Sequence, residues 1–437
     1  MKEWKKKIEN KTVRIGILGL GYVGLPLARE FANAGIKVLG FDIDEKKVKV
    51  LNTGKSIIKN VPHAEVRNMI NSKKFTATTQ FSRIKDVDAM LICVPTPLTE
   101  NREPEMKYVI NSCRTIAKFL QRDQLISLES TTYPGTTREL MAPILETSGL
   151  KVGKDFYLAY SPEREDPGNK NFSTRTIPKV VGGLTEKCRE IAQMVYELAI
   201  ETVIPVSSVE AAEATKILEN VYRCINIAMV NELKMVFDRM DINIWEVIRA
   251  ASTKPFGFSP FYPGPGLGGH CIPIDPFYLT WKARQFGMPT RFIELAGEIN
   301  TNMPHYVIAR TMDALNDRRK SLRGSKILVL GLAYKPDIDD VRESPSLELI
   351  KLLREKGAKV DYNDPYISAT HKQRRYDLQM KSKTLSAEML KTYDAVLIST
   401  NHSDYNYDWI VKYSQLVIDT RNATANVRVG KDKTVRS

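Results

Sequence analysis

The hydrophobic pattern divides the chain into two stretches in which short apolar runs alternate with helical patterns. In the first stretch, the runs that predict buried strands are residues 13–18, 37–41, 89–94, 125–130 and 179–183. Strands that alternate with helices are typical of a parallel sheet with crossover helices. The first stretch therefore predicts one parallel sheet.

Between the two stretches the pattern becomes that of long helices. Residues 208–240 are rich in Ala, Glu, Leu and Met and contain no Gly or Pro, which predicts one long helix. A second helical block is expected at residues 289–320. The alternation then resumes, with expected strands at 326–332, 359–364, 395–400 and 416–419 and a helix near 345–356. The stretch past Thr424 carries no packing signal.

The predicted fold is therefore α/β, with two Rossmann-like parallel-sheet domains joined by a long central helix and a helical connector. A chain of 437 residues is too long for one ordinary core, which agrees with several domains. The expected domain boundaries are 1–207, 208–322 and 323–437.

Composition and charge narrow the functional classes. The formal net charge is +14, and most of the basic residues are dispersed along the chain. Dispersed positive charge favours small phosphorylated ligands over nucleic acid, which usually needs a dense basic stripe. No apolar run reaches membrane-spanning length, and the glycines of residues 15–28 argue against a signal peptide there. The five cysteines form no CxxC pair, so we expect free thiols, a cytoplasmic location and no bound metal.

A glycine-rich turn follows the first predicted strand and opens a helix. Glycines in such a turn let the backbone approach a pyrophosphate, and the helix start supplies N–H donors and a positive dipole. An acidic residue at the end of the next strand would accept hydrogen bonds from a ribose and repel a 2′-phosphate, which favours NAD over NADP. The alternative is a tight turn without a ligand. The expected NAD-binding residues are Gly19, Gly21, Tyr22, Val23, Gly24 and Asp42.

The corresponding turn in the second sheet, within residues 331–346, lacks this glycine pattern. It contains one glycine, followed by Lys335 and Arg342. Cations in place of glycines could hold phosphates by charge, and the alternative is a solvated loop.

A second loop, GPGLGGHCIPID at residues 264–275, surrounds Cys271 with glycines. Backbone N–H groups in such a loop can stabilise a thiolate and a neighbouring oxyanion. A zinc site of His270, Cys271 and Asp275 lacks a fourth ligand at usable spacing. A buried structural cysteine does not explain the glycines. A nucleophilic cysteine agrees best with an NAD site, because a thiohemiacetal lets an aldehyde donate a second hydride.

Seven ordered motifs resemble those of the UDP-glucose/GDP-mannose dehydrogenase family, the nucleotide-sugar 6-dehydrogenases, over nearly the whole chain. They are GLGYVGLPLA, VPTP, ESTTYPGTT, SPE, the KxxxN of the long helix, GGHCIPID and YKPDIDDVRESP. The segments SPEREDPGN, IPKVVGG and TKPFGFSPFYPGPG look most like UDP-N-acetylglucosamine 6-dehydrogenases. The resemblance implies an N-terminal NAD-binding domain, a central dimerisation and substrate domain, and a C-terminal UDP-binding domain.

The resemblance also implies a reaction, the four-electron oxidation of the sugar C6 alcohol to a carboxylate with two NAD consumed. UDP-glucose is the alternative substrate. The SPEREDPGN segment argues against it, because it differs from the SPEFL type of plain UDP-glucose enzymes. An alternative from another class is a catalytically idle NAD-binding regulator. The implied product serves a surface polysaccharide, and the implied assembly is a homodimer or a dimer of dimers.

Residue roles carry over from the family by position. The implied catalytic residues are Cys271 as nucleophile, Lys216 and Asn220 at the oxyanion, Asp275 as a base, and Glu163 and Thr131 for proton and water traffic. NAD would also contact Thr96, Thr131 and Arg342. The implied substrate-binding residues are Glu163, Arg164, Lys216, Asn220, Phe256, Phe258, Tyr262, Gly268, Lys335 and Arg421. His270 is a weaker candidate base, since adjacent loop residues usually point apart.

Overall fold

The computed structural model describes the chain except residues 59, 100–102, 166–171, 270–271 and 374. By their internal contacts the residues form two compact units. The first unit comprises Met1–Glu219 and Tyr278–Met288, and the second comprises Asn220–Phe277 and Pro289–Ser437.

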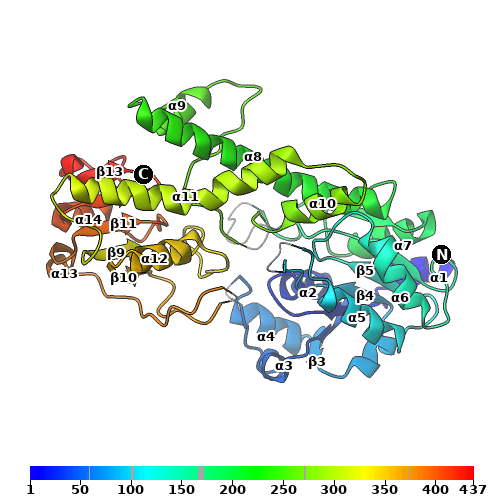
Figure 1. The fold of residues 1–437 in the computed structure, drawn as a ribbon. Helices are drawn as coiled ribbons and strands as arrows, with labels where there is room; N and C mark the ends of the chain where they lie inside the picture. Colours follow the sequence, from blue (N-terminus) through cyan, green and yellow to red (C-terminus); the bar gives the residue numbers. More distant parts are fainter. Residues whose placement is uncertain (59, 100–102, 166–171, 270–271, 374) are drawn as a thin grey trace. The chain divides into compact units, whose positions relative to one another are not determined.

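An eight-stranded sheet organises the first unit (Figure 1), in the order β3-β2-β1-β4-β5-β6-β7-β8. Its strands are β1 (Arg14–Leu18), β2 (Lys37–Phe41), β3 (Phe75–Thr78), β4 (Ala89–Ile92), β5 (Leu125–Leu128), β6 (Tyr157–Tyr160), β7 (Lys179–Gly183) and β8 (Val203–Pro205). The first six strands have the Rossmann order, 3-2-1-4-5-6. Every pair is parallel except β6 with β7, which is antiparallel.

Helices cover both faces of this sheet, as a parallel sheet requires. The helices of the first half are α1 (Lys2–Glu9), α2 (Gly24–Asn33), α3 (Glu45–Asn52), α4 (His63–Asn71), α5 (Lys107–Ala117), α6 (Ala142–Glu146) and α7 (Glu186–Tyr196), with short turns η1 (Phe81–Asp86) and η2 (Thr136–Met141). Ile15 and Ile17 pack with residues of α2, α4 and α7. The alternate positions on neighbouring strands, such as Met90 and Ile126, are equally buried.

The helical stretch expected in the middle of the chain is α8 (Val209–Arg239), which continues from the first unit into the second. It is followed by α9 (Ile244–Ala251), α10 (Asp275–Arg284) and α11 (Arg291–Asn316).

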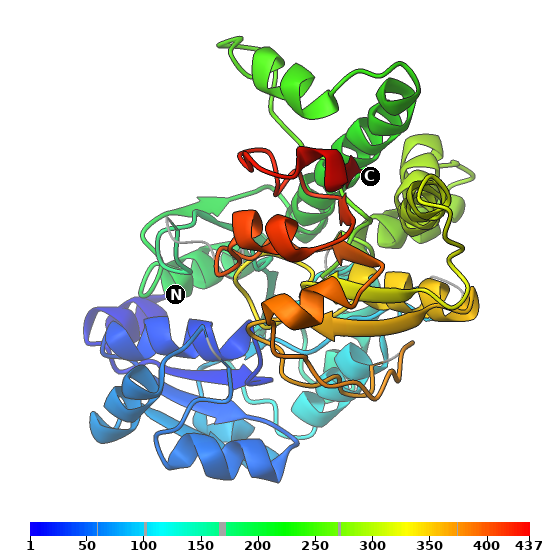
Figure 2. The same ribbon diagram turned by 90° about the vertical axis from the view of Figure 1, so that its left-hand side faces the viewer.

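A five-stranded parallel sheet organises the rest of the second unit, in the order β10-β9-β11-β12-β13. Its elements are β9 (Lys326–Leu330), α12 (Pro345–Glu355), β10 (Lys359–Asn363), α13 (Ala387–Lys391), β11 (Ala395–Ile398), α14 (Tyr407–Tyr413), β12 (Val417–Asp419), η3 (Lys431–Lys433) and β13 (Thr434–Arg436). Helices α11 and α12 bury one face, and α13 and α14 bury the other (Figure 2). The predicted α/β class with two Rossmann-like sheets is confirmed.

The structure adds an element in the C-terminal stretch, where the sequence carries no packing signal. Residues past Thr424 do pack, because β13 adds a parallel strand to β12 and the Ser437 side chain is buried. A three-residue strand of mixed polarity shows no hydrophobic pattern, and its order comes from the backbone ladder of its neighbour.

Candidate functional site

The three glycines of the first turn have different jobs. Gly19 has a φ of 97°, and a Cβ there would lie 2.5 Å from the carbonyl oxygen of Cys93. A Cβ on Gly24 would lie 1.9 Å from the carbonyl oxygen of Gly19. A Cβ on Gly21, by contrast, would have no atom within 4 Å. Gly19 and Gly24 are therefore required by packing, whereas Gly21 leaves open space before α2.

The surroundings of this space fit the pyrophosphate and ribose of NAD. Helix α2 begins at Gly24 without a side-chain hydrogen bond at its N-cap, and the positive end of its dipole lies at this turn, although the N–H of Leu25 donates to the carbonyl oxygen of Gly21 at 3.1 Å. Asp42 follows β2 directly and is 8% exposed. Its carboxylate accepts hydrogen bonds from the N–H groups of Leu20 (3.1 Å) and Asp44 (3.0 Å). An ionised carboxylate has about four acceptor sites, which leaves capacity for ribose hydroxyls.

The equivalent turn of the second sheet is closed. Gly331 follows β9 with a φ of 82° and matches Gly19. At the end of β10, Asp364 accepts hydrogen bonds from the backbone of Leu332 and pairs with the buried His402 at 3.0 Å. The Ser344 side chain caps α12 by accepting from the N–H of Ser346. In the second sheet, the aspartate after β10 and the N-terminus of α12 thus both have partners within the protein. In the first sheet, Asp42 and the N-terminus of α2 remain open for a dinucleotide.

Further predicted residues gather at the carboxyl edge of the first sheet, where parallel strands all end on the same side. Thr96 follows β4 and is buried, with its carbonyl oxygen 2.8 Å from the Tyr278 hydroxyl. Thr131 follows β5 and is half-buried, and Glu163 follows β6. Arg164 forms an ion pair with Glu219 at 2.7 Å. These positions border the same edge as the glycine turn.

Sequence reasoning missed a charged cluster at this edge. Glu129 lies directly after β5, and its side chain is fully buried. Lys179 begins β7, and its side chain is 5% exposed. The Lys179 ammonium lies 2.6 Å from the Glu129 carboxylate and 3.5 Å from that of Glu163. The signal that could have found the cluster is a lone charge at the edge of an otherwise apolar strand.

The residues predicted at the oxyanion lie on α8. Lys216, in the first unit, is 7% exposed, and Asn220, in the second, is 1% exposed. The Asn220 side-chain amide donates to the Asp275 carboxylate at 2.6 Å, and Asp275 begins α10. The structure thus brings two of the predicted residues into one buried pair. Cys271 and His270, on which the nucleophile and zinc hypotheses depend, lie outside the described residues.

The glycines before Cys271 are explained by packing within the second unit. A Cβ on Gly264 would lie 2.3 Å from the Arg421 guanidinium. A Cβ on Gly268 would lie 2.4 Å from the Tyr334 side chain. Gly269 has a φ of 81° and donates to the carbonyl oxygen of Arg342 at 2.9 Å. The loop therefore fits closely against the segments that follow β9 and β12.

Those segments carry the cations predicted to contact nucleotides. Lys335 and Arg421 are half-buried after the carboxyl ends of β9 and β12. Burial lowers the pKa of Arg421 to about 10, although the Asp419 carboxylate opposes the shift. The Arg342 guanidinium donates three hydrogen bonds to the two carboxylate oxygens of Asp340.

The predicted aromatic residues are exposed. Phe256 is 70% exposed, Phe258 37% and Tyr262 49%, and Tyr262 stacks on Trp245 with ring centroids 5.6 Å apart.

The four described cysteines are free thiols. Cys113, Cys188 and Cys224 are buried, and Cys93 is half-buried. Burial raises the pKa of Cys113 to about 12 and that of Cys224 to about 11. It also raises the pKa of Cys93, with the Glu129 charge adding to the effect.

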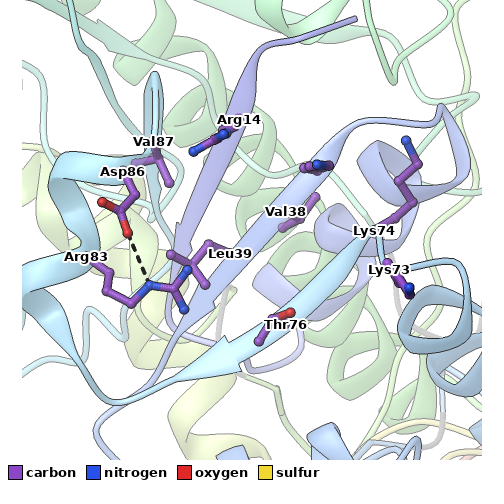
Figure 3. A pocket seen from close by; sticks show the side chains of 10 residues that line it. Arg14, Val38, Leu39, Lys73, Lys74, Thr76, Arg83, Asp86 and Val87 are labelled. Carbon is purple, nitrogen blue, oxygen red and sulfur yellow. Dashed lines mark hydrogen bonds and ion pairs between the residues drawn. The ribbon is translucent and has the colours of Figure 1, made fainter.

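A basic surface pocket lies at the opposite, amino edge of the first sheet (Figure 3). It has a volume of about 160 Å³, and its cations include Arg14, Lys37, Lys74 and Arg83, the last paired with Asp86 at 3.2 Å. It contains none of the predicted site residues.

Comparison with known proteins assigns the two sheets to two different domains of one family. Residues 13–200 match the NAD binding domain of the UDP-glucose/GDP-mannose dehydrogenase family, 210–302 its central domain, and 328–426 its UDP binding domain. No helix in the described part of the chain is long and apolar enough to cross a membrane.

Individual relatives match along most of the chain. A UDP-N-acetyl-D-glucosamine 6-dehydrogenase of Salmonella typhi is 35% identical over 90% of this chain and 91% of that protein. Protein CapL of Staphylococcus aureus is 36% identical over 93% of this chain and 95% of that protein. The solved UDP-D-ManNAc dehydrogenase of Pyrococcus horikoshii superposes with a TM-score of 0.87 at 33% identity, covering 97% of this chain and 98% of that one. Three matched domains and full-length relatives lead to one conclusion: the chain is an NAD-dependent oxidoreductase that belongs to the UDP-glucose/GDP-mannose dehydrogenase family.

Proposed function

We propose that the chain oxidises the C6 alcohol of a UDP-N-acetylhexosamine, with UDP-N-acetylglucosamine as the best candidate, to the uronic acid. The observation that carries the proposal is the contrast between the open glycine turn of the first sheet and the closed, cation-flanked turn of the second. Such a pair suits one dinucleotide and one nucleotide sugar. The names of the Salmonella and Pyrococcus relatives support an N-acetylhexosamine.

The proposed chemistry needs two oxidations at one carbon. Bound NAD supplies a hydride acceptor for each of them. In the first, C6 loses a hydride and its hydroxyl proton passes to a base, which gives the aldehyde. The Cys271 thiolate then adds to the aldehyde, and the resulting thiohemiacetal carbon loses the second hydride to become a thioester. Water cleaves the thioester, which releases the carboxylate and regenerates the thiol.

The other residues would orient and stabilise these species. Lys216 and Asn220 would hold the negative charge that develops on the C6 oxygen. The 2.6 Å contact of Asn220 with Asp275 supports this role, because it fixes the orientation of the amide. Asp275 would also act as a base, and Glu163 and Thr131 would guide the proton and the hydrolytic water.

Two sets of residues would bind the rest of the ligands. Thr96, Thr131 and Arg342 would contact NAD in addition to the glycine turn. The substrate would contact Lys335, Arg421, Arg164, Gly268, Phe256, Phe258 and Tyr262.

The proposed assembly is a homodimer or a dimer of dimers. Helix α8 exposes large apolar side chains, among them Leu218 (67%), Met229 (45%) and Val236 (45%), which support association through this helix. The proposed setting is the cytoplasm, where the product would serve a surface polysaccharide.

A substrate panel tests the reaction. Purified protein is incubated with NAD and UDP-N-acetylglucosamine, its galacto and manno epimers, or UDP-glucose, and NADH is followed by absorbance. We expect two NADH per sugar, with highest kcat/KM on an N-acetylhexosamine. Highest kcat/KM on UDP-glucose would favour the UDP-glucose enzyme, and no turnover with salt-sensitive DNA binding would favour the idle regulator.

The role of Cys271 has its own test. Cys271→Ala should bind NAD and substrate but lose formation of the uronic acid, and any residual reaction should stop at an aldehyde with one NADH per sugar. Cys113→Ala, at a buried cysteine of α5, is the matched control and should keep two NADH per sugar. If Cys271→Ala still yields two NADH at a normal rate, the nucleophile hypothesis fails.

A further inference from the structure

The charged cluster of Glu129, Lys179 and Glu163 is unusual because its charges are largely buried, with side chains that are 0%, 5% and 13% exposed. Two carboxylates and one ammonium are removed from water here, which costs several kcal/mol per ion unless the groups compensate one another. The three residues come from three segments at the carboxyl edge, after β5, after β6 and at the start of β7.

Glu129 is fixed in place from both sides. One of its oxygens lies 2.6 Å from the Lys179 ammonium, and the other accepts a hydrogen bond from the Tyr196 hydroxyl. That hydroxyl also lies 2.9 Å from the Ser127 hydroxyl, and Tyr196 is fully buried on α7. The ammonium of Lys179 is therefore held by a rigid partner.

Glu163 is held differently, because only one of its oxygens accepts hydrogen bonds from residues that the structure describes. Its Oε1 accepts from the N–H groups of Arg164 and Glu165, both at 2.7 Å. Its Oε2 is buried and has no hydrogen-bond partner among the described residues, and Lys179 lies 3.5 Å away. One oxygen of this carboxylate is thus positioned by the backbone, while the other keeps its acceptor capacity.

We propose that Lys179, anchored by Glu129 and Tyr196, is a positioning residue that keeps the Glu163 carboxylate ionised and its Oε2 ready to accept a proton or a water hydrogen bond. The proposal rests on the proposed function, in which Glu163 takes part in proton and water traffic.

The charges around Glu163 give the sign of the effect. Burial would raise the pKa of Glu163, but Lys179, the two backbone N–H donors and Lys216 outweigh it and hold the pKa below its ordinary value. Two further carboxyl groups, Glu129 and Glu165, and the Cys93 thiol face the same cluster. Without Lys179, burial and the Glu129 charge would both favour protonation of Glu163.

Lys179→Met should therefore move the acid limb of the pH profile of kcat to higher pH, by about one unit or more. Lys179→Arg, which keeps the charge, should retain the wild-type limb. Adding Glu129→Gln to Lys179→Met should move the acid limb part of the way back to lower pH, because it removes the Glu129 carboxylate that Lys179 no longer compensates. A merely structural lysine would lower kcat at every pH and leave the limb in place.

A direct titration separates this inference from the proposed function. Difference infrared spectroscopy of the ligand-free wild type minus Glu163→Gln reports the ionisation of Glu163 without turnover. An unchanged Glu163 titration in Lys179→Met overturns the inference, whatever the activity. If the titration shifts but Glu163→Gln retains normal turnover, the pairing holds and the catalytic role of Glu163 fails. Should Lys179→Met not fold, Glu129→Gln alone must shift the Glu163 titration to lower pH, and no shift refutes the pairing.

Discussion

At the scale of single residues, two aspartates in equivalent positions have opposite roles. Asp42 follows β2, and Asp364 follows β10. Each carboxylate accepts a hydrogen bond from a backbone N–H two residues after the neighbouring strand, β1 or β9. Asp364 is saturated, since it also accepts from other backbone groups and contacts His402. Only Asp42 retains capacity for a ligand, so cofactor selectivity should depend on it.

Asp42→Ala should raise the KM for NAD about tenfold or more, the scale of a hydrogen bond to a charged group, and relax the rejection of NADP. Asp42→Asn removes the charge but keeps one acceptor oxygen for Leu20 or Asp44, so it should accept NADP with a smaller loss of stability. Steady-state kinetics with both cofactors measure these effects. Unchanged NAD kinetics in both variants would remove Asp42 from the ribose site.

Lys216→Ala should lower kcat by about 10²-fold or more and raise the substrate KM much less, because an oxyanion partner acts mainly in the transition state. The matched control is Lys118→Ala, at an exposed lysine after α5 that should leave both parameters unchanged. Near-normal kcat in Lys216→Ala would mean that this lysine only packs on its helix.

At the scale of elements, two glycines of the same turn should have different effects when substituted, Gly24 on stability and Gly21 on NAD binding. Gly24→Ala forces a Cβ against the Gly19 carbonyl and should destabilise the first unit by at least about 2 kcal/mol. Gly21→Ala places a methyl group in open space, so its thermal midpoint without ligand should equal that of the wild type. The same methyl should raise the NAD dissociation constant tenfold, about 1.4 kcal/mol. Thermal unfolding with and without NAD tests both variants, and a destabilised Gly21→Ala would contradict the assignment.

The elements also show what sequence patterns can reveal. Apolar runs identified β1, β2, β4, β5, β7, β9, β11 and β12, because a doubly covered parallel strand is largely apolar. Strand β10 was also expected, although it alternates apolar and polar residues. The strands β3, β6, β8 and β13 were not expected, and β3, β8 and β13 contain exposed or half-buried positions that interrupt the apolar pattern. The glycine turn could be predicted because its motif lies within six consecutive residues, 19–24. The Glu129–Lys179 pair was not, because its members are 50 residues apart and meet only in the folded sheet.

At the scale of the whole molecule, two parallel-type sheets of different strand order match different domains of the family, the eight-stranded sheet an NAD binding domain and the five-stranded sheet a UDP binding domain. The net charge of +14 suggested phosphorylated ligands, and the folded chain places cations at the carboxyl edge of the second sheet. It also places a basic pocket at the amino edge of the first, which no sequence motif indicated (Figure 3). Composition therefore predicted the kind of ligand, and the fold shows at which edge of each sheet the cations gather.

The burial of Cys113, Cys188 and Cys224, together with the partial burial of Cys93, has a practical consequence for chemical labelling. Alkylating reagents attack the thiolate, and thiols with raised pKa in closed surroundings react slowly. In the native protein, iodoacetamide at neutral pH should therefore modify the peptide containing Cys271 first, with loss of uronic acid formation in step with one equivalent of label. Peptide mass spectrometry over time distinguishes this from modification of Cys93, the half-buried alternative. A protein that reacts at a single cysteine accepts one covalent probe or inhibitor without engineering.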